Sequence, residues 1–227
     1  PNFVDQVKTY VVDEATFQPA AALPPYTETR TFLGYRRGPA RGVGTRNTIV
    51  LLGTTSRTGS YVKQLAVRLQ GELKNYPNID GIVPVAHTEG GAEQPNNLAL
   101  LLRTLAGFIV NPNVGAVLVV DYGIELVTNR MVEGYLRAHN YPLDDVRHTF
   151  LSLGGGFQEN LAKGEALVRD WLPAVNAAER TPESIAHLKI ALQCGGSDAF
   201  SGISANPLLG WIARELVRYG GAANLAE

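Results

Sequence analysis

The sequence predicts a doubly wound α/β fold, with three layers (α/β/α) and a mostly parallel sheet of about five strands. Five short apolar runs follow one another, and each is followed by a polar, often glycine-rich loop and then by a helix pattern. Strands that alternate with helices in this way require right-handed crossovers, so the sheet is parallel and covered on both faces. The regular pattern begins after a segment rich in Pro, Gly, Thr and Arg. We therefore expect an extended arm or linker over 1–45 and an α/β domain over 46–227.

The first two units are marked by the runs TIVLLG (48–53) and GIVPVA (81–86). The first run is followed by TTSRTGS and a helix pattern over 61–73, and the second by HTEGGAEQPNN and a helix near 98–108. Pro84 lies inside the second run and has no amide hydrogen, so we expect it at a place in the sheet where that donor is not needed.

The third run, GAVLVV (115–120), is the clearest strand, because it is continuously apolar as a buried parallel strand should be. The loop DYGIE leads from it to a helix near 126–139. The fourth strand is HTFLSL (148–153), which a glycine triplet separates from a long helix that ends near residue 178.

The fifth run, LKIALQ (188–193), precedes the loop CGGSDAFSG and a helix over 207–219. Asn206 is a favourable N-cap, and Pro207 suits the first helical position. The loop concentrates glycines, serines and an aspartate at a strand-to-helix junction. Such a junction either makes a difficult turn or places amides and hydroxyls against a small polar ligand.

The composition excludes several classes of function. Twenty basic and 21 acidic residues give a net charge of −1, and no run of basic residues is longer than two, so we expect neither a nucleic-acid partner nor a membrane partner. There is no spanning apolar segment and no signal-peptide pattern at the N-terminus. The single cysteine excludes an internal disulfide framework. We therefore expect a cytoplasmic globular protein. We also expect it to form a homo-oligomer, and specifically a dimer.

In folds of this class, ligands bind beyond the carboxyl ends of the strands. The loops TTSRTG, HTEGGAEQ, DYGIE, GGGFQE and CGGSDAFSG should therefore meet at one end of the sheet. His87 directly follows the second strand and lies close to Glu89, which makes it a candidate general base or metal ligand. The position of this histidine in the sequence fits a helix-capping or surface role equally well.

The last loop also has two interpretations. Gly195 and Gly196 provide only the turn that leaves a buried strand, or they expose amides that bind a carboxylate or phosphate. In the second case the small polar side chains of the loop add contacts; these are Ser197, Asp198 and Ser201. Cys194 is either a buried small hydrophobe or a metal ligand or nucleophile. No dinucleotide, zinc-peptidase, nucleophile-elbow or redox-thiol motif is present, and the loop after residue 53 lacks the lysine of a phosphate-binding loop.

Four stretches resemble, in order and spacing, the galactarate dehydratase/altronate dehydratase family, which includes sulfolactate sulfo-lyase. They are GYRRGPARGVGTRN (34–47), HTEGG (87–91), NPNVGAVLVV (111–120) and CGGSDAFSGISANPLLG (194–210), and the last is the most specific. The resemblance implies a lyase that acts on hydroxylated sugar acids with a divalent metal, Fe²⁺ in the family. Members usually continue into a further α/β domain, and many have a small β domain ahead of the arm.

The implied reaction removes a proton beside a carboxylate and expels a β-hydroxyl as water. It needs a base, a Lewis acid and an anchor for the substrate carboxylate. The resemblance implies His87, Glu89 and Asp198 as catalytic residues, and Cys194, His87 and Glu125 as metal ligands. The implied substrate contacts are Arg46, Asn47, Ser56, Thr88, Gly195, Gly196, Ser197, Ser201 and Asn206.

The chain departs from the family pattern at four positions. Ser56, Gly91 and Ile124 stand where members carry cysteines, and Asn111 stands where they carry a histidine. These residues cannot preserve a thiolate-rich metal site. Oxygen ligands would suit a harder cation; the candidates are Asp121, Glu125 and Asp198. Two functions stay open: an active lyase on an acidic polyol, or a catalytically silent relative that binds a sugar acid or serves as a partner subunit.

Overall fold

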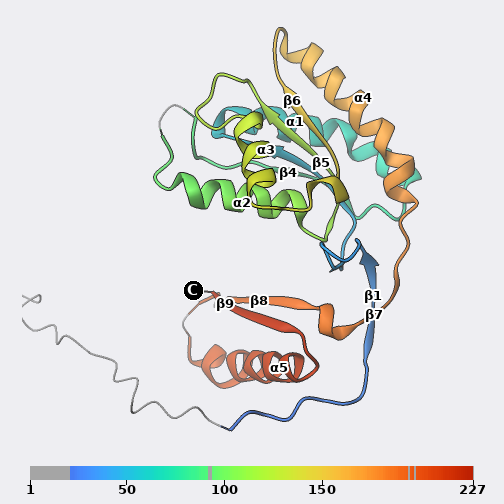
Figure 1. Ribbon diagram of the computed structural model, residues 1–227, viewed down its shortest axis with the longest axis vertical. Helices are drawn as coiled ribbons and strands as arrows, with labels where there is room; N and C mark the ends of the chain where they lie inside the picture. Colours follow the sequence, from blue (N-terminus) through green and yellow to red (C-terminus); the bar gives the residue numbers. More distant parts are fainter. Residues whose placement is uncertain (1–20, 92–93, 194, 197, 227) are drawn as a thin grey trace, which may run out of the picture.

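A four-stranded parallel sheet forms the centre of the protein in the computed structural model, which describes residues 21–91, 94–193, 195–196 and 198–226. The strand order is β4-β3-β5-β6. The strands are β3 (Thr48–Gly53), β4 (Gly81–Val85), β5 (Val114–Asp121) and β6 (Arg147–Ser152). Together with the helices between them, they form what we call the first lobe (Figure 1).

Two helices cover each face of this sheet, which confirms the predicted three-layer α/β/α class. One pair is α1 (Gly59–Leu69) and α4 (Phe157–Asn176), and the other is α2 (Leu98–Val110) and α3 (Asn129–Ala138). Short 3₁₀ turns complete the lobe; they are η3 (Ser56–Thr58), η4 (Gln70–Asn75) and η5 (Leu143–Asp145). Within the described ranges, no helix has the length and apolar character needed to cross a lipid bilayer.

Strand β3 is buried on both faces. Ile49 and Leu51 pack into the core that α1 and α4 cover, while Val50 and Leu52 pack into the core under α2 and α3. A strand buried in this way has no need of a polar face, which explains its continuously apolar sequence. The neighbouring strand β4 lies at the edge of the sheet, where Pro84 is tolerated as we expected.

Two helix boundaries differ from the predicted ones for local reasons. Helix α1 ends at Leu69, and the residues that follow form the tighter turn η4. Helix α3 begins at Asn129 rather than near 126. The Thr128 side chain caps it by accepting a hydrogen bond from the Met131 amide, and the Asn129 amide donates to Asp121 at 2.6 Å. The residues before Thr128 are therefore held in a loop.

The strand predicted over 188–193 forms as β8 (Lys189–Gln193), but it does not join the four-stranded sheet. It pairs in parallel with β9 (Ala222–Ala226), and α5 (Asn206–Arg218) connects the two strands. We call β8, α5 and β9 the second lobe. The main sheet therefore has four strands, not five. The chain leaves the first lobe through β7 (Thr181–Ser184), which pairs antiparallel with β1 (Thr31–Arg36), and then through η6 (Ile185–His187) (Figure 1).

The expected N-cap at Asn206 is wrong. Its backbone is helical, with φ −65° and ψ −44°, and a π-helical turn over Ser201–Ala205 precedes it. The Asn206 amide donates to the carbonyl of Ser201, five residues earlier. Pro207 explains this wider turn, because a proline inside a helical run lacks an amide donor and its ring crowds the carbonyl four residues before it.

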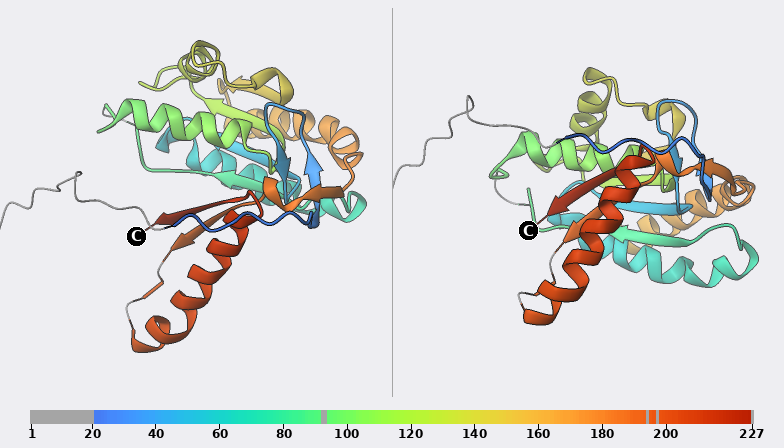
Figure 2. Two further views of the ribbon diagram at one scale, coloured as in Figure 1. Left: turned by 60° about the horizontal axis from the view of Figure 1, so that its bottom comes forward. Right: turned by 90° about the horizontal axis from the view of Figure 1, so that it is seen from below.

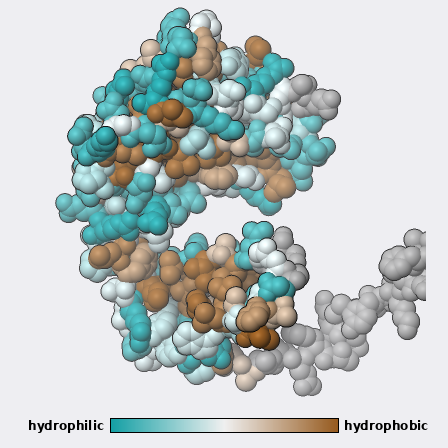
Figure 3. Space-filling model, turned by 180° about the vertical axis from the view of Figure 1, so that it is seen from behind, coloured by the Kyte–Doolittle hydropathy of each residue, from teal (hydrophilic) through white to brown (hydrophobic). Residues whose placement is uncertain are grey.

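The second lobe leaves much of its apolar surface exposed (Figure 3). Leu216 is the buried residue of α5, while the Trp211 side chain is 54% exposed and Leu225 of β9 is 84% exposed. A single helix cannot cover both faces of a two-stranded parallel sheet. This lobe therefore differs from the first in having little core of its own.

Part of the predicted arm is ordered into strands. Residues 31–36 form β1, and Val43–Gly44 form the short strand β2 beside it. The segment before β1 is fastened to the second lobe. The Tyr26 ring stacks on Tyr219 with centroids 4.3 Å apart, and its amide donates to the Arg218 carbonyl at 2.9 Å.

Candidate functional site

Four of the five polar loops meet at the carboxyl edge of the main sheet. Parallel strands end on the same side, so the loops after β3, β4, β5 and β6 lie next to one another. Main-chain bonds join them: Thr54 donates to the Val120 carbonyl at 3.0 Å, and Leu153 to the Asp121 carbonyl at 2.7 Å. The Ser56 amide donates to the Glu89 carbonyl at 2.9 Å. We call this group of loops the carboxyl-edge site.

His87 and Glu89 lie at this site, as the sequence predicted. His87 Nε2 is 3.1 Å from the Gly53 carbonyl oxygen, and the Glu89 amide donates to His87 Nδ1 at 3.2 Å. Because a carbonyl oxygen only accepts, Nε2 carries the proton and the ring is the neutral tautomer. Both ring nitrogens are engaged, so His87 ties the loop after β4 to the end of β3. No described residue donates a hydrogen bond to the Glu89 carboxylate, which is half-buried beside exposed Thr88.

Ser56 and Gly91 are in close contact across two loops. A Cβ atom built on Gly91 would lie 2.1 Å from Ser56 Oγ, so a glycine is needed here as long as the serine keeps its rotamer. These are two of the positions at which the resembling family carries cysteines. In this chain the contact is made by the hydroxyl of Ser56 and the backbone of Gly91, in place of the two thiols that the resemblance implies.

Arg57 is the cation of the carboxyl-edge site that sequence reasoning missed. Its side chain is exposed, and its Nε donates to the Gly91 carbonyl. This bond fixes the near side of the guanidinium group, and no described residue accepts from its two terminal nitrogens. An arginine in this state presents a fork that matches a carboxylate. The signal in the sequence was a single basic residue in a polar loop that follows a buried strand.

Asp121 and Glu125 are structural acceptors in this conformation. Asp121 is 1% exposed and accepts from the Asn129 amide, from Asn129 Nδ2 at 3.0 Å and from Ser152 Oγ at 2.6 Å. Glu125 is buried and accepts from the Tyr122 amide at 2.8 Å and the Ile124 amide at 3.1 Å. Both carboxylates therefore hold the loop after β5 in place.

A layer of buried polar groups lies beneath this edge. The hydroxyls of Thr54 and Thr55 and the Oδ1 atom of Asn129 have no hydrogen-bond partner among the described residues. Buried polar atoms without partners cost free energy, and in native proteins they gather at functional sites. This observation favours the carboxyl edge over other parts of the first lobe as the place of function.

The donors described at this edge do not fit a metal ion. In the described ranges, no group of three or more His, Cys, Asp or Glu side chains converges on a common point. Of the predicted ligands, His87 has both nitrogens engaged and Glu125 accepts from main-chain amides. Cys194 lies outside the described residues.

Arg46 and Asn47 do not lie at the carboxyl edge, because they precede β3. They lie at its opposite end, roughly 20 Å away for a strand of six residues. Asn47 is fully buried: its Nδ2 donates to the carbonyls of Asn78 and Val175, at 2.8 and 2.9 Å. Exposed Arg46 lies 3.9 Å from Asp80, which also accepts from the Asn47 amide at 2.6 Å.

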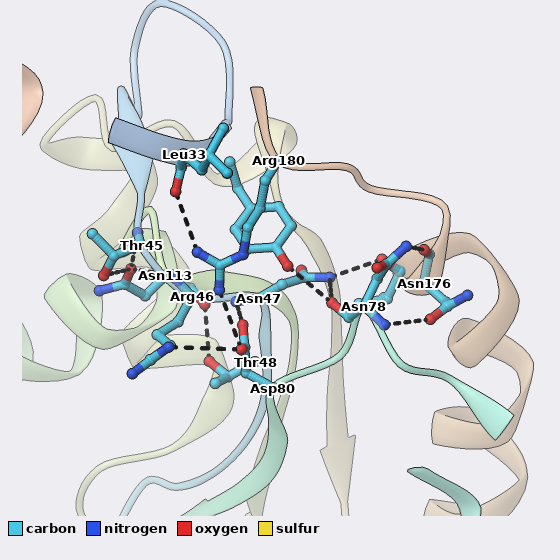
Figure 4. Close-up of polar contacts among 12 residues, drawn as sticks. Leu33, Thr45, Arg46, Asn47, Thr48, Asn78, Asp80, Asn113, Asn176 and Arg180 are labelled. Atoms are coloured by element: carbon cyan, nitrogen blue, oxygen red, sulfur yellow. Dashed lines mark hydrogen bonds and ion pairs between the residues drawn. The ribbon is translucent and has the colours of Figure 1, made fainter. Parts of the chain in front are cut away.

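A second motif completes this polar cluster at the amino edge. Asn113 Oδ1 accepts from the amides of Thr45 and Arg46, at 2.7 and 3.0 Å (Figure 4). A Cβ atom on Gly115 would lie 2.3 Å from Asn47 Oδ1, so only glycine fits beside that amide. The stretches GVGTRN and NPNVG, far apart in the sequence, therefore contact each other at the start of the sheet.

The loop after β8 lies in the second lobe and apart from the carboxyl-edge site (Figures 1 and 2). Side-chain hydrogen bonds within this loop are local: Asp198 Oδ1 accepts from the Ser201 amide at 2.8 Å, and Ser201 Oγ donates to the Gly196 carbonyl at 3.3 Å. No hydrogen bond or ion pair of the described residues links this loop to His87 or Glu89. The expected convergence of several loops is therefore found for the first four, but the expected position of the last loop near His87 is wrong. Gly195 and Asn206 lie in the second lobe too, and Ser197 lies outside the described residues.

Comparison with protein families gives two matches. Residues 34–176 match the second domain of D-galactarate dehydratase/altronate hydrolase, and residues 185–227 match the C-terminal part of D-galactarate/altronate dehydratase. The boundary between the two matches falls between the first and second lobes.

Curated relatives agree with these matches. An altronate dehydratase of Bacillus subtilis is 31% identical over 89% of this chain and 40% of its own length. An altronate dehydratase of Escherichia coli is 30% identical over 95% of this chain and 43% of its own. The (2R)-sulfolactate sulfo-lyase subunit beta of Chromohalobacter salexigens is 32% identical over 80% of this chain and 42% of its own. The chain spans about two fifths of the length of these relatives.

Proposed function

The chain belongs to the D-galactarate dehydratase/altronate hydrolase family, and on this premise we propose that it is the sheet-bearing part of a lyase that removes water from a hydroxylated sugar acid. One observation carries the proposal. The family match over 34–176 contains the whole four-stranded sheet and every loop of the carboxyl-edge site. Two relatives of about 30% identity are named altronate dehydratase.

The reaction sets the requirements for the site. A base takes the proton from the carbon beside the carboxylate, and the hydroxyl on the next carbon leaves with a proton as water. A double bond then joins the two carbons, and the resulting enol rearranges to a keto acid. Negative charge develops on the substrate carboxylate as the proton leaves, so a fixed cation there lowers the barrier.

We assign the anchoring of this carboxylate to Arg57. Its Nε is held by the Gly91 carbonyl, which leaves two terminal nitrogens for two carboxylate oxygens. Exposed Ser56 lies beside it and adds a hydroxyl donor. Arg57 takes over the role that the sequence suggested for Arg46, which lies at the opposite edge of the sheet.

We assign proton abstraction to Glu89, with His87 as a positioning residue. The Glu89 carboxylate accepts no hydrogen bond from a described residue, so it is available to accept a proton. His87 joins the Glu89 amide to the Gly53 carbonyl and thereby fixes the base relative to β3. No step of this proposal passes through a metal ion, because the described donors do not fit one.

A second function rests on a different observation. At the contact between Ser56 and Gly91 the thiols of the family are absent, and both nitrogens of His87 are engaged. One relative is moreover named as the beta subunit of a lyase. These facts favour a silent relative that binds a sugar acid or acts as a partner subunit.

A panel of aldonates and aldarates, offered to the full-length protein, separates the two functions. Keto-acid formation is measured by colorimetric assay and binding by calorimetry, each with and without added divalent metal. Turnover of any member supports the lyase. Binding without turnover supports the silent relative, and neither binding nor turnover contradicts both.

A further inference from the structure

A cavity of about 620 Å³ lies at the amino edge of the main sheet, on the opposite side from the carboxyl-edge site. One wall comes from the first lobe, where it includes Arg41, Thr45 and Asn113. The other wall comes from the turn η6 and the start of β8, where it includes His187 and Lys189. The cavity has the size of known small-molecule sites and is built by both lobes.

Arg41 contributes a buried cation to the first wall. It is 8% exposed, and all of its hydrogen bonds go to main-chain carbonyls. Nε donates to Val110 at 3.0 Å, Nη1 to Asp145 at 3.1 Å, and Nη2 to Asn111 and Val114 at 2.6 and 2.7 Å. Carbonyl dipoles at the end of α2 orient this guanidinium, but no carboxylate pairs with it.

The ionisation of Arg41 reflects this lack of a counter-charge. Burial, and after it the positive charge of nearby Arg37, lower the pKa of the Arg41 guanidinium to about 10, while the charge of Asp145 acts in the opposite direction. Burial also lowers the pKa of Arg37. Buried Arg41 and half-buried Arg37 therefore lie near each other, and the hydrogen bonds of both go to carbonyl and amide oxygens.

The second wall adds positive charge without adding negative charge. Lys189 and His187 are exposed to the cavity region, and Lys189 makes no ion pair with a described residue. No aspartate or glutamate is present among the described residues that line the cavity. Neutral hydrogen-bonding groups of Thr45, Asn111 and Asn113 complete the lining. Such a lining repels cations and attracts anions.

We propose that this cavity is a second ligand site, which binds a small molecule carrying a carboxylate or phosphate group. Lys189 binds the anion directly, and His187 adds a donor from the same wall. Arg41 supplies a fixed positive field from the other wall. Because the two walls belong to different lobes, a bound anion would hold the second lobe against the first. The inference does not rest on the lyase function.

Two probes, inorganic phosphate and malonate, test this site in the full-length protein. Each is titrated by calorimetry at constant ionic strength, so that general screening is the same throughout. We expect one or both to bind. Lys189→Ala should weaken binding about tenfold or more, since a charge-assisted hydrogen bond is lost. The two probes separate a phosphate site from a carboxylate site.

Two matched variants control the experiment. Lys74→Ala removes another exposed lysine without an ionic partner among described residues, and it should leave the affinity unchanged. Arg57→Ala removes the cation of the carboxyl-edge site, so anion binding that this variant abolishes belongs to that site and not to the cavity. The proposal is overturned if neither probe binds, if Lys189→Ala binds like the unchanged protein, or if Arg57→Ala is the variant that loses binding.

Discussion

The two lobes use the same local pattern, strand–loop–helix–strand, and bury it to very different degrees. In the first lobe four helices cover both faces of the sheet, and Leu51 and Leu118 are fully buried. In the second lobe one helix covers one face of two strands, and Trp211 and Leu225 stay largely exposed. A pattern in the sequence therefore predicts a β–α unit, but whether that unit has a core depends on how many neighbours cover it.

The largest expected effect is on the free energy of unfolding, and it compares a core residue of the first lobe with an exposed residue of the second. Leu118→Ala opens a cavity in the centre of the main sheet and should lower the free energy of unfolding by about 2–5 kcal/mol. Trp211→Ala removes a larger but half-exposed side chain and should cost less than about 1 kcal/mol. Urea denaturation followed by circular dichroism measures both. Equal losses would mean that the second lobe has a core comparable to that of the first.

The next effect concerns the amino-edge cluster. Asn47→Ala removes an amide that joins the start of β3 to Asn78, Val175 and Arg37. It takes the amide donor from the Val175 carbonyl and one acceptor from Arg37, so we expect a loss of about 2–3 kcal/mol in unfolding free energy. The same urea experiment applies, with Thr104→Ala on the exposed side of α2 as a control. A loss below 0.5 kcal/mol (roughly the error of such a measurement) would contradict the structural role.

These clusters show which parts of the protein were readable from sequence. The runs TIVLLG and GAVLVV were recognisable as strands because burial on both faces makes a parallel strand continuously apolar. The pairing of β8 with β9 was not, because AANLA carries little strand signal and the choice of partner depends on distant contacts. Strand pairing is a tertiary property that local propensity does not fix.

The site was predicted in part for a similar reason. Ser56, His87 and Glu89 follow strands and do lie at the carboxyl edge. Arg46 and Asn47 precede a strand, so they lie at the opposite edge, where Asn47 joins the start of the sheet to Asn78. Arg57 was passed over because nothing in the sequence shows that its Nε meets the Gly91 carbonyl.

A smaller effect tests the contact between the loops of the carboxyl edge. Gly91→Ala places a methyl group against Ser56 Oγ, so the serine has to leave its rotamer at a cost of about 1 kcal/mol. In a Ser56→Ala background the same change should cost almost nothing. A double-mutant cycle on unfolding free energies measures the coupling between these positions. No coupling would mean that the two loops do not touch.

The smallest effect concerns the arm fastened to the second lobe, and it depends on pH. The Tyr26 hydroxyl donates to Glu215, and this bond, together with Arg214 and Arg218, lowers the pKa of that carboxyl. Because the pKa of Glu215 is lower in the folded protein, its ionised carboxylate stabilises the fold at pH values above 4.5, the ordinary pKa of this group. This stabilisation is lost as the pH falls through the lower pKa of the folded state. The arm should therefore become sensitive to an acid protease below pH 4.5 while the first lobe stays intact.

Tyr26→Phe is the matched variant for this prediction. It keeps the ring that stacks on Tyr219 and removes the hydroxyl that binds Glu215. Just above pH 4.5, where an acid protease still cuts and Glu215 is ionised, the arm of this variant should be cleaved more readily than that of the unchanged protein, and its cleavage should depend less on pH. Cleavage with the same pH profile in both proteins would show that the hydroxyl does not fasten the arm.

The central claim is that the sugar acid binds at the carboxyl edge, through Arg57, and that Arg46 at the amino edge does not contact it. The affinity of the full-length protein for galactarate and altronate, measured by calorimetry for Arg57→Ala and Arg46→Ala, tests it most directly. We predict that Arg57→Ala weakens binding roughly 10–100-fold with unchanged unfolding free energy, because a charge-assisted pair is lost. Arg46→Ala should bind like the unchanged protein. Normal binding by Arg57→Ala together with lost binding by Arg46→Ala would contradict the claim.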